Sequence, residues 1–123
     1  MAKTVLVVDD SASLRQVVGI ALKGAGYNVI EACDGVDGLA KLAAADKVHL
    51  IISDVNMPNM DGIQFVKTLK QKPEYKFTPV IMLTTEAEEE KKREGQAAGA
   101  KAWVIKPFQP QQMLAAVSKL ILP

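Results

Sequence analysis

The sequence predicts a doubly wound α/β fold built on a five-stranded parallel sheet. Five short runs rich in Val, Ile and Leu alternate with longer segments of helical periodicity along the 123 residues. The short runs are apolar throughout, which is typical of strands buried on both faces of a parallel sheet. Right-handed crossovers between such strands place helices on both faces. The expected strands cover residues 4–8, 28–32, 50–53, 80–84 and 102–105.

Four of the longer segments carry apolar stripes at helical spacing. Ser11 or Ser13 can cap the first of these helices. Asp34-Gly35 opens the second, a turn at residues 59–62 precedes the third, and Pro110 suits the first turn of the last. The stripes consist of Leu14, Val17, Val18, Ala21, Leu22 and Ala25; Leu39, Leu42 and Ala43; Ile63, Val66 and Leu69, with Phe65 nearby; and Met113, Leu114, Val117, Leu120 and Ile121.

The remaining helical segment, from Glu86 to Gln96, is rich in charge. Its acidic residues precede its basic ones, which suits the helix dipole. Gly95 inside it costs about 1 kcal/mol relative to alanine. Its apolar anchors are only Ala87, Ala97 and Ala98. We therefore expect a weakly held helix, which is either a solvated helix without a special role or an element that shifts when the site changes state.

Length and composition predict one domain spanning residues 1–123. The chain is 49% hydrophobic and 24% charged, which allows a single core of ordinary size. Its formal net charge of +1 offers no electrostatic case for binding nucleic acid or a membrane. The chain opens with neither a long apolar run nor a signal-peptide pattern, so we expect a cytoplasmic protein. We also expect it to be a monomer.

Two isolated residues have plain expectations. Cys33 is the only cysteine, so an intramolecular disulfide is excluded, and we expect a small buried side chain near a strand end. His49 precedes the third strand, and we expect it at the surface rather than as a metal ligand or phosphocarrier.

Polar residues follow or close four of the five expected strands. Asp9 and Asp10 follow the first, Asp54 the third, Thr84 closes the fourth, and Lys106 follows the fifth. In an open parallel sheet, ligands bind outside the carboxyl ends of the strands. Three carboxylates, a hydroxyl and an ammonium should therefore meet in one crevice. Such a set predicts a site for a divalent metal and a phosphoryl group.

Four motifs carry a resemblance to a known family, in order and at strand ends. They are Val-Val-Asp9-Asp10-Ser, Ser-Asp54-Val-Asn-Met57-Pro58-x-Met-Asp61-Gly62, Leu-Thr84-Thr-Glu-Ala and Lys106-Pro107-Phe108. Over its whole length the chain resembles the receiver domain of bacterial two-component signalling, especially the single-domain CheY-like response regulators. The resemblance implies a flavodoxin-like (βα)5 fold with strand order 2-1-3-4-5.

The resemblance also implies a role for each site residue. Asp54 would be the nucleophile that accepts a phosphoryl group. Mg²⁺ would be bound directly by Asp10, Asp54 and the backbone carbonyl of Asn56, with Asp9 acting largely through water. Lys106 would contact the phosphoryl group and steady the carboxylates beforehand.

A second group of residues resembles the conformational switch of the family. Thr84 would donate a hydrogen bond to the new phosphoryl oxygen, and Trp103 would swing between exposed and buried positions to change a partner-binding surface. Pro107 resembles the cis-proline position of the family. Thr85 stands where the family usually has a smaller residue. Asn56 and Glu86 are both polar, which predicts a phosphoryl lifetime of seconds to minutes.

The expected function is that of a stand-alone response regulator, with no separate turnover substrate beyond its own phosphorylation and dephosphorylation. A histidine kinase would phosphorylate Asp54, and an output protein such as a flagellar motor switch protein in chemotaxis would read the change. A receiver in a phosphorelay outside chemotaxis is the main alternative. A phosphatase with an aspartate nucleophile is disfavoured because Asn56 stands where the haloacid-dehalogenase type needs a second aspartate. A flavodoxin-like cofactor binder is disfavoured because Asp9 and Asp10 would repel a phosphate, and no glycine-rich phosphate loop is found.

Overall fold

The computed structural model describes residues 2–84, 89–106 and 108–121, with only the backbone for 89–91. Its sheet has five parallel strands in the order β2-β1-β3-β4-β5, which confirms the predicted fold class. The structure extends the third strand by one residue, so that Asp54 closes it. The strands are β1 (Thr4–Val8), β2 (Asn28–Ala32), β3 (Leu50–Asp54), β4 (Val80–Thr84) and β5 (Ala102–Ile105).

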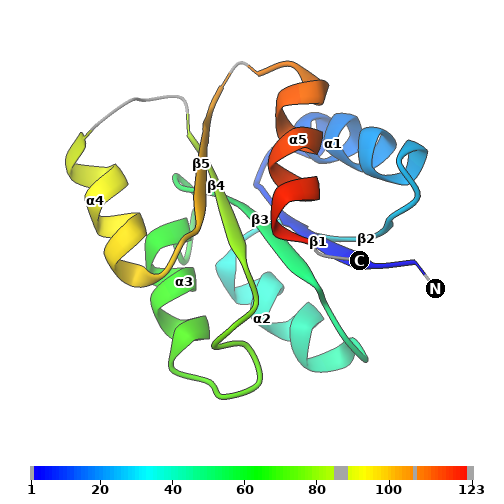
Figure 1. The fold of residues 1–123 in the computed structure, drawn as a ribbon. Coiled ribbons are helices and arrows are strands. Elements are labelled where there is room, and N and C mark those ends of the chain that lie inside the picture. The colour runs from blue at the N-terminus through cyan, green and yellow to red at the C-terminus, as the bar shows by residue number, and fades with distance from the viewer. Residues whose placement is uncertain (1, 85–88, 107, 122–123) are drawn as a thin grey trace.

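Five helices cover the sheet on both faces. Helices α1 and α5 pack on one face, and α2, α3 and α4 pack on the other (Figure 1). Ser11 caps α1, Asp34 caps α2 and Asp61 caps α3, each by accepting a hydrogen bond from a backbone N–H three residues on. None of the helices in the described part of the chain is long and apolar enough to span a bilayer. The helices are α1 (Ala12–Gly24), α2 (Gly35–Ala44), α3 (Gly62–Lys70), α4 (Glu89–Ala98) and α5 (Pro110–Leu120).

Each face of the sheet has its own hydrophobic core. Alternate residues of β1 point to opposite faces, so Val5 and Val7 pack towards α1 and α5, whereas Leu6 and Val8 pack towards α2 and α3. Phe65 of α3 is fully buried in the core on the side of α2 and α3. In β1, β3 and β4 the apolar runs therefore mark strands that are covered on both faces, whereas the edge strands β2 and β5 are partly exposed.

Five single-residue expectations are wrong, and a sixth holds only in part. Ala25 and Ala43, both expected on buried stripes, are exposed. The sequence predicts Val17 on the buried stripe of α1, but Val17 is 52% exposed because the residues of α1 buried against the sheet include Val18 and Leu22. Ala97, an expected anchor of α4, is exposed. Cys33 is exposed because it follows β2, an edge strand. His49 is half-buried, and its Nδ1 accepts a hydrogen bond from the Thr4 N–H at 3.0 Å.

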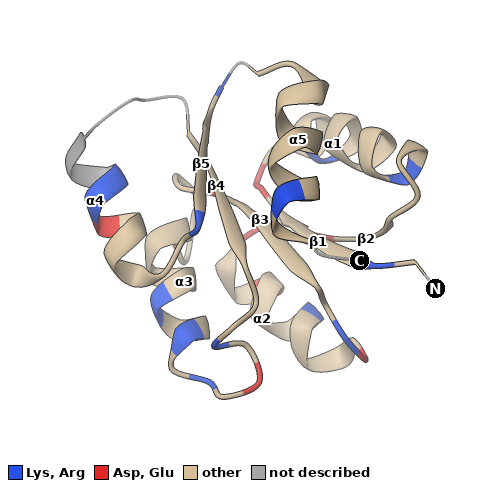
Figure 2. Cartoon of the chain, viewed as in Figure 1, with Lys and Arg blue, Asp and Glu red and all other residues tan. Residues whose placement is uncertain are grey.

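Charge is distributed unevenly, which the net charge does not show. Lysines gather on α3 and on the loop after it, at the end of the molecule where the strands begin (Figure 2). Among them, Lys70 donates hydrogen bonds to the carbonyls of Tyr75, Lys76 and Thr78 at 3.3, 3.2 and 2.5 Å. Burial and nearby Lys101 lower the pKa of Lys70. This ammonium ties the loop to the end of α3.

Gly95, which is unfavourable for a helix, is explained by a contact with β5. A Cβ atom at Gly95 would lie 2.6 Å from Cζ3 of Trp103, so the indole packs directly on the backbone of α4. Trp103 also packs against the core on this face. The glycine therefore gives the large ring a place against a helix with few apolar side chains of its own.

Gly95→Ala tests this contact. Alanine should favour the helix by about 1 kcal/mol, but overpacking against the indole should cost about 1–3 kcal/mol. We expect a net loss of stability in urea unfolding and a shift in Trp103 fluorescence. The same substitution in a Trp103→Phe background should stabilise instead. Gly24→Ala is the matched control, because a Cβ there meets nothing within 4 Å. If Gly95→Ala, the same substitution in the Trp103→Phe background, and Gly24→Ala all raised the stability equally, the contact would be contradicted.

Candidate functional site

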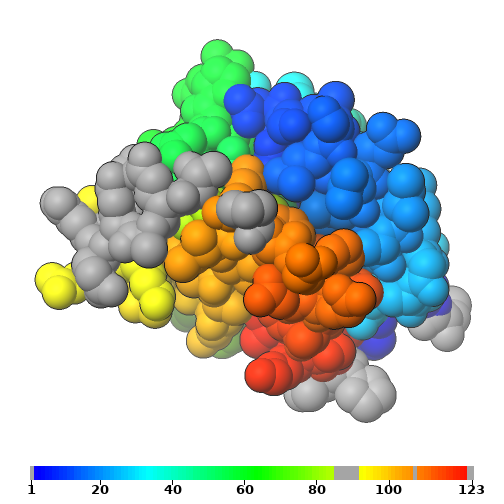
Figure 3. All heavy atoms as spheres, turned by 90° about the horizontal axis from the view of Figure 1, so that it is seen from above, coloured from blue at the N-terminus to red at the C-terminus, as the bar shows by residue number. Residues whose placement is uncertain are grey.

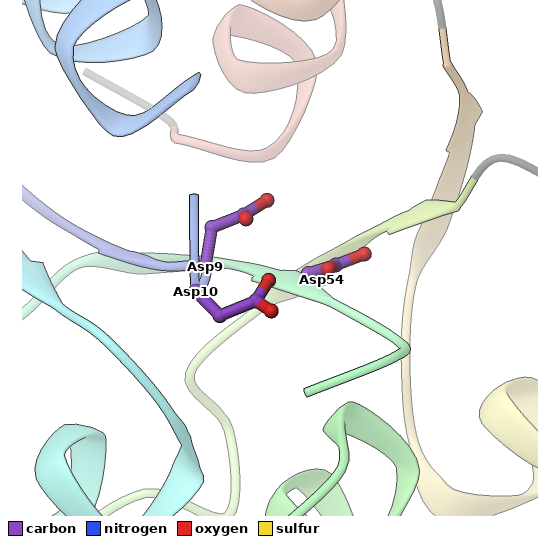
Figure 4. A group of neighbouring side chains, drawn as sticks. All are labelled: Asp9, Asp10 and Asp54. Atoms are coloured by element: carbon purple, nitrogen blue, oxygen red, sulfur yellow. The ribbon is translucent and has the colours of Figure 1, made fainter. Parts of the chain in front are cut away.

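The three predicted carboxylates meet at the carboxyl edge of the sheet. Strands β1 and β3 are neighbours, with Val8 opposite Ser53, so the residues that follow lie side by side. One oxygen from each of Asp9, Asp10 and Asp54 lies within 4.8 Å of the others (Figure 4). Asp9 and Asp54 are buried, whereas Asp10 is exposed. Segments from the whole length of the chain border this edge, in blue, green and orange in Figure 3.

Lys106 lies between two of these carboxylates. Its Nζ is 3.1 Å from Oδ2 of Asp9 and 3.2 Å from Oδ1 of Asp54. The backbone N–H of Lys106 donates to the carbonyl of Thr84, which fixes the start of the side chain beside β4. The ammonium thus offsets the repulsion between the two buried acids, and it lies within reach of any group bound to Asp54.

The crevice alters the acidity of Asp54. Burial and the charge of Asp9 raise the pKa of this carboxyl, and the ammonium of Lys106 together with the Val55 N–H opposes that rise. The net direction is upward. Ionisation of Asp54 therefore costs more in this crevice than in water, and a bound cation would reduce that cost.

The donor chemistry of the crevice fits Mg²⁺. The cluster offers carboxylate oxygens, and Mg²⁺ prefers a few carboxylates together with water and phosphate oxygens. Asp10 is exposed, so part of the site is open to solvent. Asn56 is also exposed and follows Asp54 by two residues, at the start of the loop that borders the crevice. The predicted ligand set is thus placed at one edge.

Thr84 lies at the end of β4, next to the strand that carries Asp54. It is 1% exposed, and the residue before it, Leu83, pairs with Asp54 in the sheet. Thr84 thus ends a strand beside the one that carries Asp54, and its side chain is shielded from solvent. Thr85, Glu86 and Pro107, which the sequence also singled out, lie outside the described residues.

Trp103 lies apart from the acidic cluster, against α4. It pairs with Met82 of β4, which lies two residues before Thr84 along that strand. Its Nε1 is buried and has no hydrogen-bond partner among the described residues. A buried N–H without a partner costs about 1–3 kcal/mol. In this position of the ring, none of the described residues pairs with the indole N–H.

Sequence reasoning missed two groups that support the site. Arg15, one turn into α1, donates from Nη1 to the backbone carbonyl of Asp9 at 2.5 Å and pairs with Glu31 at 3.2 Å. Asn59 donates to buried Asp34 at 2.7 Å. Contacts such as these join separate segments of the chain, and no local pattern signals them.

Asp54→Asn tests the electrostatic cost of the crevice. Because the folded-state pKa of Asp54 lies above its ordinary value, the contribution of Asp54 to wild-type stability should fall as pH rises through the folded-state pKa. Without Mg²⁺ at neutral pH, the variant should be more stable than the wild type, because the neutral amide avoids the cost of ionising a group in this crevice. The gain should shrink as the pH falls below the folded-state pKa, and on addition of Mg²⁺. Thermal unfolding against pH measures it, with exposed Asp46→Asn as the control. A less stable variant at neutral pH would contradict the expectation.

Comparisons with known proteins agree with this geometry. The sequence pattern of the response regulator receiver domain matches residues 5–118. The chain is 38% identical to chemotaxis protein CheY1 of Helicobacter pylori, over 86% of both chains, and 37% identical to protein PilG of Pseudomonas aeruginosa, over 92% of this chain and 83% of that one. A crystal structure of chemotaxis protein CheY4 of Vibrio cholerae superposes with a TM-score of 0.93 at 49% identity, covering 98% of this chain and 99% of that one. The chain belongs to the receiver domain family of response regulators.

Proposed function

We propose that this protein is a Mg²⁺-dependent switch in which a histidine kinase phosphorylates Asp54 and a partner protein reads the result. One observation carries the proposal: the buried Asp54 carboxylate lies 3.2 Å from the Lys106 ammonium, in a cluster with two further carboxylates. Asp10, Asp54 and the carbonyl of Asn56 would hold the metal, with Asp9 acting through water. When bound, Mg²⁺ supplies positive charge to the phosphoryl oxygens.

The residues of the crevice account for the transfer itself. A carboxylate oxygen of Asp54 forms a bond to phosphorus while the P–N bond of a donor phosphohistidine breaks, and the departing imidazole takes up a proton. Oδ1 of Asp54 accepts from the Val55 N–H at 2.9 Å and contacts Lys106, so we assign the attack to Oδ2. Lys106 can then shift its charge to a phosphoryl oxygen. Autodephosphorylation, with water as nucleophile, is the only other chemistry we assign.

Phosphorylation would be read through Thr84 and Trp103. A phosphoryl group on Asp54 brings a strong acceptor next to β4, and the buried Thr84 hydroxyl would donate to it. Movement of Thr84 toward that group would change the surroundings of Trp103, whose Nε1 lacks a partner among the described residues. A small local electrostatic change would thereby bias a two-state element.

We assign the switch to chemotaxis because two of its relatives, CheY1 and CheY4, are named as chemotaxis proteins. The output partner would then be a flagellar motor switch protein, reached by a monomer in the cytoplasm. A phosphorelay outside chemotaxis is the second candidate, since PilG, which is similar to almost the same degree as CheY1, is not named as a chemotaxis protein. An aspartate-nucleophile phosphatase is not favoured, because Asn56 offers an amide where that chemistry needs a carboxyl.

Titration with Mg²⁺ and then beryllofluoride, followed by Trp103 fluorescence, tests the proposal. Beryllofluoride stands in for the phosphoryl group on the aspartate. We expect a fluorescence change that requires Mg²⁺ and is absent in Asp54→Asn, because the acceptor oxygen is missing there. An NMR titration serves as a second readout. Mg²⁺ binding without any beryllofluoride response in either readout would overturn the switch, and failure to bind Mg²⁺ would indicate a degenerate receiver.

A further inference from the structure

Two loops at the carboxyl edge are joined by a hydrogen bond outside the acidic cluster. Nδ2 of Asn59, in the loop between β3 and α3, donates to Oδ2 of Asp34 at 2.7 Å. The other oxygen of Asp34, Oδ1, accepts from the Asp37 N–H at 2.8 Å and caps α2. Asp34 is only 7% exposed while Asn59 is exposed, so this hydrogen bond to a charged group is partly shielded from water.

Two further features hold the tip of the same loop against the start of α2. Asn59 has a φ of 66°, a left-handed conformation that asparagine tolerates better than most residues. Next to it, Met60 packs on Gly35, where a Cβ atom would lie 2.7 Å from Cγ of Met60. The tip is therefore shaped to present the Asn59 amide to Asp34.

The base of the loop is closed separately. The Gly62 N–H donates to the carbonyl of Val55 at 2.8 Å. A Cβ at Gly62 would lie 2.0 Å from the backbone oxygen of Asp54, so this approach requires glycine. With base and tip both fixed, the intervening Asn56 has little freedom to move relative to Asp54.

We propose that the Asp34–Asn59 hydrogen bond positions the backbone carbonyl of Asn56 for the metal at Asp54. Asp34 and Asn59 are positioning residues in this account, since they act through the loop and not by contact with the ion. The inference rests on the Mg²⁺ site of the proposed function. It adds that the start of α2, which the tip of the loop contacts, contributes to metal affinity.

The two oxygens of Asp34 have separate tasks, and an exchange of side chains can separate them. Asn59→Ala removes the hydrogen bond and leaves the cap on α2 intact. The double substitution Asp34→Asn/Asn59→Asp restores it in reverse and keeps the net charge. In that variant the amide at position 34 caps α2 with its oxygen and donates from its nitrogen to the carboxylate at position 59. Asn59→Gly keeps the left-handed backbone accessible but has no amide.

Mg²⁺ affinity, measured by calorimetry on the full chain, tests the inference alongside thermal unfolding. We expect Asn59→Ala and Asn59→Gly to weaken binding by about tenfold, as is typical when a group that orients a metal ligand is lost. The exchanged pair should recover most of that loss. Asn28→Ala, an exposed asparagine at the start of β2, is the matched control and should bind as the wild type does.

The outcomes separate this inference from the proposed function. Wild-type affinity in Asn59→Gly would show that only the backbone conformation matters and would overturn the role of the hydrogen bond. Failure of the exchanged pair to recover affinity, while it unfolds at the wild-type temperature, would overturn it as well. If the wild type itself does not bind Mg²⁺, the proposed function fails first.

Discussion

Repulsion between buried carboxylates is the constraint on which the rest of the site depends. Two unit charges 4 Å apart interact by about 4 kcal/mol at an effective dielectric constant near 20. The strand order creates this situation, because β1 and β3 are neighbours and aspartates follow the one and close the other. Lys106 offsets part of the repulsion from the end of β5, on the other side of β4. The fold thus holds negative charge at a place where a bound cation would relieve the repulsion. In the proposed function, the Asp54 carboxylate there attacks a phosphoryl group.

The same constraint explains why the support around the crevice is built from the backbone. Asp9 receives the Ser11 N–H at 2.9 Å and Asp54 receives the Val55 N–H at 2.9 Å, while Arg15 donates to the carbonyl of Asp9. These contacts fix the directions of the carboxylates without neutralising them. A site neutralised by several side-chain cations would have little affinity left for a metal. Lys106 contacts Asp9 and Asp54, which leaves the exposed Asp10 available on the solvent side.

The sequence was sufficient for the sheet and for the residues at its carboxyl edge. Strands buried on both faces have an unambiguous apolar pattern, and the rule that ligands bind at strand ends placed Asp9, Asp54 and Lys106 together. It was not sufficient for Arg15 or for Asn59, because their contacts join separate segments. It also misjudged Cys33. The expected strand order already placed the second strand at the edge of the sheet, but neither that order nor the apolar pattern shows that the residue after β2 is left uncovered.

Two residues break a local rule, and each break has a tertiary cause. Gly95 weakens α4 as a helix, yet any side chain there would collide with Trp103. Asn59 adopts a left-handed backbone, yet that conformation directs its amide to Asp34. Departures from local preference are expected where function or a specific contact outweighs them. Asn59 lies in the loop between β3 and α3 that would carry the metal-binding carbonyl of Asn56, and Gly95 lies where the indole of Trp103 packs on α4. The input and the output of the proposed switch are therefore both positioned by residues that local propensity alone would disfavour.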